Sequence, residues 1–313
     1  FLSVPGYVVF WVLFAVALAL FLQRVILLIR LLRLGKPERR FDRLRHRLAG
    51  MLAIPVSQRT NLKHLSVRDV APLGHAVMFW GLGIFLIGYV AFLGLGAGFG
   101  AFPIFKGGGF ERTWLSMMDV VGILILLAMV AVIVKRYIVK PARLHREEST
   151  LEKVIQPVLI VVIIAVVVLH YLIEGFGYAA NDVRGDWPPI GMALADSLRD
   201  ASIGADGLAT VFKSLWWLNY AILLAAMVYT PRSKHLHPLF IFPNTAFRSL
   251  APKGTLRPVD LKDTASIRRA DIRDFTWKQL LDSYACTWCG RCHVACPAQA
   301  SGKTLSPREL ILS

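Results

Sequence analysis

Five long apolar stretches, separated by basic or polar segments, dominate the pattern of hydrophobic positions along the chain. Each is long enough to cross the apolar core of a bilayer, which takes about 20 helical residues. The pattern therefore predicts an all-α membrane protein with five transmembrane helices. The stretches lie at residues 5–32, 70–97, 114–139, 154–175 and 211–231.

The polar segments after the fourth and fifth stretches predict further elements. Residues 177–210 carry several aspartates and predict an interfacial helix with a loop. We expect a transmembrane domain at residues 1–250, a polar connector at 251–274, and the start of another domain at 275–313. That last domain should open with a helix from Phe275 to Tyr284.

Composition supports the membrane class, and the charge pattern predicts an orientation. The mean hydropathy is +0.55, 56% of residues are hydrophobic, and the formal net charge is +16. Of the 36 lysine and arginine residues, 31 lie in the segments 24–68, 135–153 and 232–313. By the positive-inside rule these segments are cytoplasmic, so the amino terminus is expected outside. Nucleic-acid binding is not expected, because lipid headgroups and water account for the basic segments.

All four cysteines lie within eleven consecutive residues, in the pattern C-x2-C-x2-C-x3-C-P. This spacing is typical of a 4Fe–4S site, with Cys286, Cys289 and Cys292 on one cluster and Cys296 on a neighbouring cluster. The other ligands of that second cluster are not in this sequence, so we expect a longer polypeptide. A zinc site or two disulfides are the alternatives, but zinc sites usually pair two separated C-x2-C units, and two disulfides would be crowded here.

Three histidines lie near the predicted cytoplasmic ends of the second and fifth stretches and suggest a b-type haem. His75 and one of His235 and His237 would supply the axial nitrogens at one membrane depth. If a helix continues through Pro231, the two later histidines point about 200° apart. We favour His237, which lies eighteen residues after Asn219 and so on the same face of a continuous helix. His235 is the alternative ligand. The alternative is that both histidines lie at the membrane boundary and hydrogen-bond to lipid.

His170 lies in the outer half of the fourth stretch, with Glu174 one turn further on the same helical face. Asp119 lies near the outer end of the third stretch, at a similar expected depth. Ionisable side chains inside a membrane are usually functional, and these three are candidates to exchange protons with a quinone. A hydrogen bond that merely satisfies two buried polar groups is the alternative for His170 and Glu174.

Several segments resemble two related kinds of membrane redox protein. The five-stretch layout with these histidines resembles the cytochrome b (gamma) subunit of respiratory nitrate reductase. Four motifs are similar to membrane-bound heterodisulfide-reductase-related iron–sulfur proteins, which include electron-transfer-flavoprotein:menaquinone oxidoreductases. The motifs are WWLN at 216–219, SKHLHP at 233–238, DFTWKQLLDSYACTWCGRC at 274–292 and GKTLSP at 302–307.

The resemblance implies a five-helix haem b bundle followed by a cytoplasmic ferredoxin-like 4Fe–4S domain, in a bacterial or archaeal cytoplasmic membrane. Electrons would pass between a cytoplasmic donor, such as electron transfer flavoprotein, two 4Fe–4S clusters, haem b and menaquinone. In nitrate-reductase-type subunits the position of Asn219 holds an outer haem ligand. One haem is therefore expected, and a second only if His170 replaces that ligand.

The sequence thus predicts a quinone-linked iron–sulfur and haem oxidoreductase of the membrane. One alternative is an electron-relay subunit of a larger respiratory complex without its own substrate site. Another is a transporter or assembly factor whose cluster is only structural, although the paired intramembrane charges that a transporter needs are not visible in the sequence.

Overall fold

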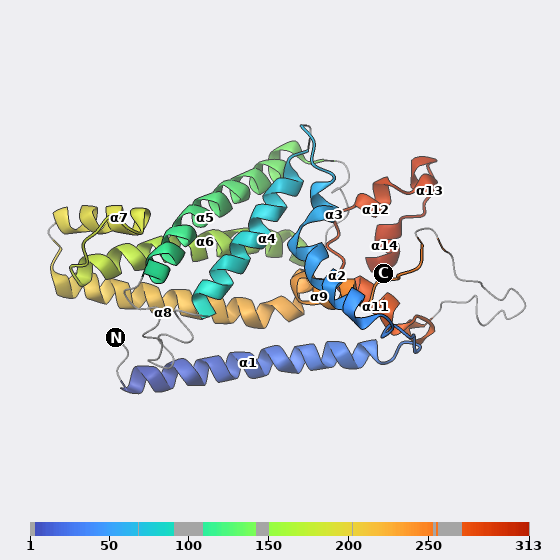
Figure 1. Cartoon of the computed structure of the whole chain (residues 1–313), viewed down its shortest axis with the longest axis horizontal. Coiled ribbons are helices and arrows are strands. Elements are labelled where there is room, and N and C mark those ends of the chain that lie inside the picture. Colours follow the sequence, from blue (N-terminus) through green and yellow to red (C-terminus); the bar gives the residue numbers. More distant parts are fainter. Residues whose placement is uncertain are drawn as a thin grey trace, which may run out of the picture. The chain divides into compact units, whose positions relative to one another are not determined.

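The structure is a computed structural model of the chain (Figure 1). Within the part of the chain that it describes, most residues are helical and no strand forms. The described residues are 4–67, 69–90, 109–141, 150–201, 203–252, 255 and 271–312.

Within the residues that the structure describes, five long helices meet the length and composition needed to cross a membrane, as the apolar pattern predicts. The chain is a multi-pass membrane protein. Residues 91–97 of the second predicted stretch lie outside the described residues. The helices are α1 (Val4–Leu32), α4 (Ala71–Gly88), α5 (Gly109–Ile133), α6 (Thr150–Ala180) and α8 (Ala205–Tyr229).

Helices α5 and α8 each begin a turn or more earlier than the apolar pattern predicts. The first turn of α5 carries Glu111 and that of α8 carries Asp206, and acidic side chains stabilise the amino end of a helix. An apolar pattern cannot detect polar first turns of this kind, so it places the start of both helices too late.

At its other end, helix α5 continues into a short π-helix, η2 (Val134–Val139).

Shorter helices fill the segments between and after the five spans. Helix α7 confirms the helix expected within residues 177–210, and α11 confirms the helix expected before the cysteines. The shorter α-helices are α2 (Leu44–Val56), α3 (Arg59–Leu62), α7 (Pro189–Asp200), α9 (His237–Ala246), α11 (Trp277–Tyr284), α12 (Arg291–Val294), α13 (Pro297–Ala300) and α14 (Pro307–Leu312).

Packing divides the chain into two compact units. The first unit comprises Phe1–Ala17, Asn61–Pro141 and Arg146–Ala226. The second comprises Leu18–Thr60, Ala142–His145 and Met227–Ser313. The expected boundaries at residues 250 and 274 separate the transmembrane, connector and cysteine-bearing segments along the sequence. They stay predictions.

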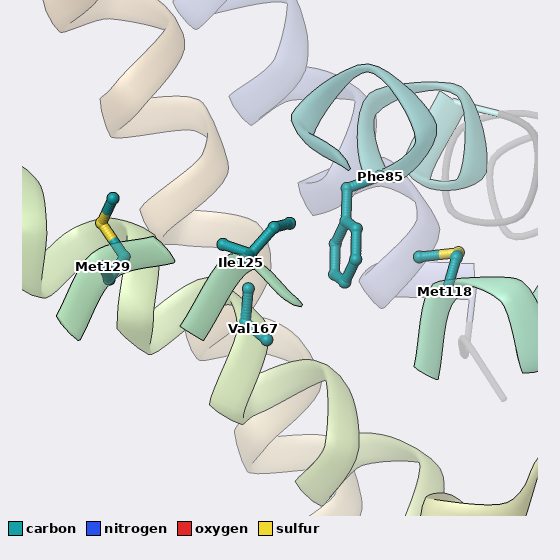
Figure 2. Packing of buried hydrophobic residues seen from close by; sticks show 5 residues of the cluster. All are labelled: Phe85, Met118, Ile125, Met129 and Val167. Atoms are coloured by element: carbon teal, nitrogen blue, oxygen red, sulfur yellow. The ribbon is translucent and has the colours of Figure 1, made fainter. Parts of the chain in front are cut away.

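The core of the first unit lies where α4, α5 and α6 meet. Figure 2 shows its buried side chains, which come from all three helices. A Cβ atom added at Gly81 of α4 would lie 2.8 Å from Ile125 of α5, so the glycine permits the close approach of these two helices. The cluster consists of Phe85, Met118, Ile125, Met129 and Val167.

The second unit packs the carboxy-terminal half of α1 against α9 and α11. Leu28, Phe240 and Leu281 form its buried apolar cluster. Helix α11 begins with a capping box, in which the Thr276 side chain accepts a hydrogen bond from the backbone N–H of Gln279, and the Gln279 side chain accepts one from the backbone of Thr276. This cap fixes the start of the helix that leads into the cysteines.

Backbone hydrogen bonds tie the start of α11 to the segment that follows α1. The Lys36 N–H donates to the carbonyl of Phe275 over 2.8 Å, and the Trp277 N–H donates to the carbonyl of Lys36 over 3.1 Å. The Trp277 indole donates to the carbonyl of Glu38 over 2.9 Å. The start of α11, which leads into the cysteines, is therefore held by the segment that follows α1.

Arg47 of α2 is 3% exposed and links α2 to the end of α9. Its Nη1 atom donates to the carbonyls of Ala246 over 3.1 Å and of Arg248 over 2.8 Å. Its Nη2 atom pairs with Asp42 at 2.6 Å. The bond to Arg47 also holds the pKa of the Asp42 carboxyl below its usual value.

We expect Arg47→Met to lower the free energy of unfolding by about 2–6 kcal/mol, because two carbonyls lose their buried donor at about 1–3 kcal/mol each. Arg45→Met, on an exposed side chain of the same helix, is the matched control and should change it by less than about 0.5 kcal/mol. Denaturant unfolding in detergent measures both variants. Equal stability of the two would contradict the role assigned to Arg47.

Candidate functional site

Three buried ionisable side chains meet in the first unit: Asp119 of α5, and His170 and Glu174 of α6. They are 0%, 6% and 9% exposed, respectively. One nitrogen or oxygen atom from each lies within 4.8 Å of the other two. The His170 Nε2 atom is 3.8 Å from the Glu174 Oε2 atom. The structure thus brings together the three residues that the sequence predicts at one depth.

Helix geometry and two hydrogen bonds position this cluster. His170 and Glu174 are four residues apart and share one face of α6. The Tyr171 hydroxyl donates to the backbone carbonyl of Asp119 over 2.6 Å, which fixes α6 against α5. The N–H of Ile190, in the first turn of α7, donates to Asp119 Oδ2 over 2.8 Å. Asp119 is therefore held from two sides.

The first turn of α7 also comes close to Glu174. A Cβ atom added at Gly191 would lie 2.9 Å from the Glu174 Oε2 atom, so a larger residue there would displace this oxygen. The sequence did not single out Gly191 or Ile190. Glycine is common in polar loops, and the approach of α7 depends on how the chain returns after α6.

Four polar atoms of the cluster have no hydrogen-bond partner within the described part of the chain. They are Asp119 Oδ1, His170 Nε2 and both carboxyl oxygens of Glu174. An oxygen of Asp119 and an oxygen of Glu174 lie within 4.8 Å of each other, and two carboxyl groups share a hydrogen bond only when one of them carries a proton. Buried polar groups are normally paired, so this cluster is suited to take up a proton or a cation.

The predicted haem histidines lie in different units. His75 lies in the second turn of α4, with an exposed side chain, and belongs to the first unit. His235 and His237 are half-buried and belong to the second unit. The pairing of His75 with either residue stays a prediction.

The structure overturns the helical-period argument that favoured His237 over His235. Helix α8 ends at Tyr229, a 3-10 turn follows, and Ser233 is extended with φ −124° and ψ 172°. Pro231 has no N–H to continue the helical bonds. His235 then lies in a 3-10 turn with its Nδ1 atom 3.3 Å from the Ser233 hydroxyl, and His237 begins α9. Angular spacing measured from Asn219 therefore does not separate the two.

The cysteine segment follows α11 and is shaped by two left-handed residues, Trp288 (φ 55°) and Gly290 (φ 73°). None of the four cysteines, all of which lie in the described part of the chain, forms a disulfide. Burial raises the pKa of the Cys286 thiol, and the nearby Cys289 and Cys292 thiols raise it further. These three are the cysteines that the spacing assigns to one cluster, so their proximity fits that ligand set.

Helix α9 connects the histidine turn to the cysteine segment within the second unit. The ring of Phe240, three residues after His237, packs edge-on against the ring of Tyr284 with centroids 5.2 Å apart. Tyr284 lies two residues before Cys286. The buried Lys278 Nζ atom donates to the Asn244 side chain of α9 over 2.7 Å. The sequence did not predict this contact, because nothing in the apolar pattern pairs a ten-residue helix with an eight-residue one.

We expect Cys286 to react with N-ethylmaleimide more slowly than Cys292 in the metal-free protein. Cys292 is exposed, whereas Cys286 is half-buried and less of it is thiolate at neutral pH. Pulsed alkylation followed by peptide mass spectrometry measures both rates, and the denatured protein is the control in which the rates converge. Faster labelling of Cys286 would contradict the described burial.

Comparison with known proteins identifies relatives among iron–sulfur oxidoreductases. The chain is 30% identical to a Bacillus subtilis protein named probable iron–sulfur-binding oxidoreductase FadF, over 97% of this chain and 41% of that protein. It is 29% identical to the EtfAB:quinone oxidoreductase of Syntrophomonas wolfei, over 76% of this chain and 33% of the relative. The chain therefore spans less than half the length of either relative.

A shorter match covers a probable membrane-anchored ferredoxin of Chromohalobacter salexigens, which is 46% identical over 57 residues, or 18% of this chain and 8% of that protein. No family model matches the chain. No solved structure matches it either.

Proposed function

We propose that this chain is part of a membrane oxidoreductase that passes electrons between a cytoplasmic donor, 4Fe–4S clusters, haem b and the menaquinone pool. The packing of Phe240 on Tyr284 carries this proposal, because it links the histidine turn to the cysteine segment in one compact unit. The names of the relatives support the iron–sulfur and quinone parts. The name of the Syntrophomonas wolfei relative supports electron transfer flavoprotein as the donor.

The cysteines would hold the iron–sulfur part of this path. Cys286, Cys289 and Cys292 would bind one 4Fe–4S cluster, and Cys296 would bind a second cluster. When bound, these clusters and a b-type haem each accept and donate single electrons. The left-handed residues at 288 and 290 reverse the chain so that the thiols can face one centre.

His75 and His237 would bind the haem, with His235 in reserve. The open face of α4 around His75 supports this assignment. A Cβ atom added at Gly74 or Gly83 would meet nothing within 4 Å, so the described residues leave space along this helix. Lipid could fill the same space, and a spectroscopic test decides between the two.

Asp119, His170 and Glu174 would handle the protons of the quinone reaction. Reduction of a quinone to a quinol takes two electrons and two protons, and oxidation returns both. The unpartnered atoms of this cluster would accept or give those protons. Ile190 and Tyr171 keep Asp119 in place while its proton moves.

The proposal is tested by electron transfer to menaquinone in lipid nanodiscs. We expect Glu174→Gln to lower the rate of quinone reduction about 10- to 100-fold while the iron and haem contents stay unchanged, because only proton exchange is lost. Asp196→Asn, on the exposed face of α7, is the control and should keep the wild-type rate. Cys289→Ser should abolish the electron paramagnetic resonance signal of a reduced cluster. Wild-type quinone reduction in Glu174→Gln would sink the assigned proton site.

The haem assignment has its own spectroscopic prediction. We expect His75→Ala to remove the b-type alpha band from the dithionite-reduced spectrum, whereas His64→Ala, on an exposed histidine of the same unit, keeps it. Comparison of His235→Ala with His237→Ala then identifies the second ligand. A preparation of the wild-type protein without any alpha band would rule out the haem.

A further inference from the structure

We propose that Asp119, His170 and Glu174 form a binding site for a divalent first-row transition-metal cation, for which Zn²⁺ is the probe. Each of the three supplies a donor atom, and these atoms lie within 4.8 Å of one another. The imidazole nitrogen and two carboxyl groups are a donor set that Zn²⁺ accepts readily, whereas Ca²⁺ and Mg²⁺ prefer oxygen alone.

Unpartnered buried atoms carry this proposal. His170 is 6% exposed, and its Nε2 atom has no hydrogen-bond partner within the described residues. The same holds for Asp119 Oδ1 and for both carboxyl oxygens of Glu174. A buried polar atom without a partner costs free energy, and a cation shared by three such atoms removes that cost for all of them.

The charges of the site also match a divalent cation. Two carboxylates and a neutral imidazole carry a charge of −2, so a bound Zn²⁺ gives a neutral complex that an apolar surrounding tolerates. The Ile190 N–H holds Asp119 Oδ2, and Oδ1 has no hydrogen-bond partner within the described residues; outer hydrogen bonds orient metal ligands in this way in known sites.

The geometry requires the donor atoms to draw together on binding. Two donors on a tetrahedral Zn²⁺ lie roughly 3.4 Å apart, whereas the three donor atoms lie within 4.8 Å of one another and the His170 Nε2 atom is 3.8 Å from the Glu174 Oε2 atom. Rotation of the Glu174 side chain would close the gap to His170, and Asp119 must move with it. Three protein ligands leave a fourth position for water, the pattern of an open site rather than a structural one.

Occupancy would block proton exchange at this cluster, a consequence that rests on the proposed quinone function. The metal would hold the same carboxyl oxygens and imidazole nitrogen that exchange the protons. Divalent cations would then inhibit quinone reduction without changing how the donor reduces the cluster and the haem.

Zinc binding to the cofactor-loaded protein in nanodiscs tests the site itself. We expect one Zn²⁺ per chain after equilibrium dialysis, and a zinc X-ray absorption spectrum with nitrogen and oxygen neighbours only. His170→Gln and Glu174→Gln should each weaken binding at least about tenfold. The matched controls are His64→Gln and Asp196→Asn, both exposed in the first unit, which should bind as the wild type does.

Absorption spectra of the wild-type protein keep the test decisive if a variant fails to fold. Sulfur neighbours would assign the zinc to the cysteines and overturn the proposal, as would no retained zinc or equal binding in His170→Gln. Quinone reduction assayed with and without Zn²⁺, and again after chelation, tests the inhibition. If the wild-type protein reduces no quinone at all, the proposed function fails while the binding result still decides the metal site.

Discussion

Two carboxyl groups and an imidazole buried among apolar helices are the constraint on which the first unit depends. Moving an ion out of water costs several kcal/mol even after the protein relaxes around it. The chain offsets part of this cost with the N–H of Ile190, which donates to Asp119 Oδ2. Helix α7 is thus part of the site, because its first turn supplies that N–H and its glycine leaves room for the second carboxyl group.

The second unit meets a different requirement, because it must hold a cysteine segment whose own helices are only four to six residues long. Helices this short are only marginally stable in isolation, so their position depends on the elements that pack against them. Helix α11 provides that support through its capping box, through backbone bonds to Lys36, and through the buried Lys278. Polar contacts outside the apolar spans therefore decide where the thiols lie.

The sequence predicted the features that depend on local pattern and missed those that depend on approach between segments. The five spans follow from apolar runs, and the pairing of His170 with Glu174 follows from helical spacing. The contacts of Gly191 with Glu174 and of Phe240 with Tyr284 could not be predicted. Each joins two helices, and the sequence does not show how the segment between those helices runs. The helical-phase argument for His237 over His235 does not hold, because the extended residue Ser233 breaks the regular spacing that it assumed, and the choice between the two stays a prediction.

Electron transfer and proton transfer require different arrangements of side chains. The unpartnered polar atoms of Asp119, His170 and Glu174 are informative for that reason. Electron transfer needs no continuous chain of hydrogen bonds between donor and acceptor, so packed side chains suffice between two redox centres. A proton moves only between atoms within hydrogen-bond reach. Buried donors and acceptors left open toward one another, as Asp119, His170 and Glu174 are, therefore mark the place where a proton, or a cation in its stead, is expected to bind.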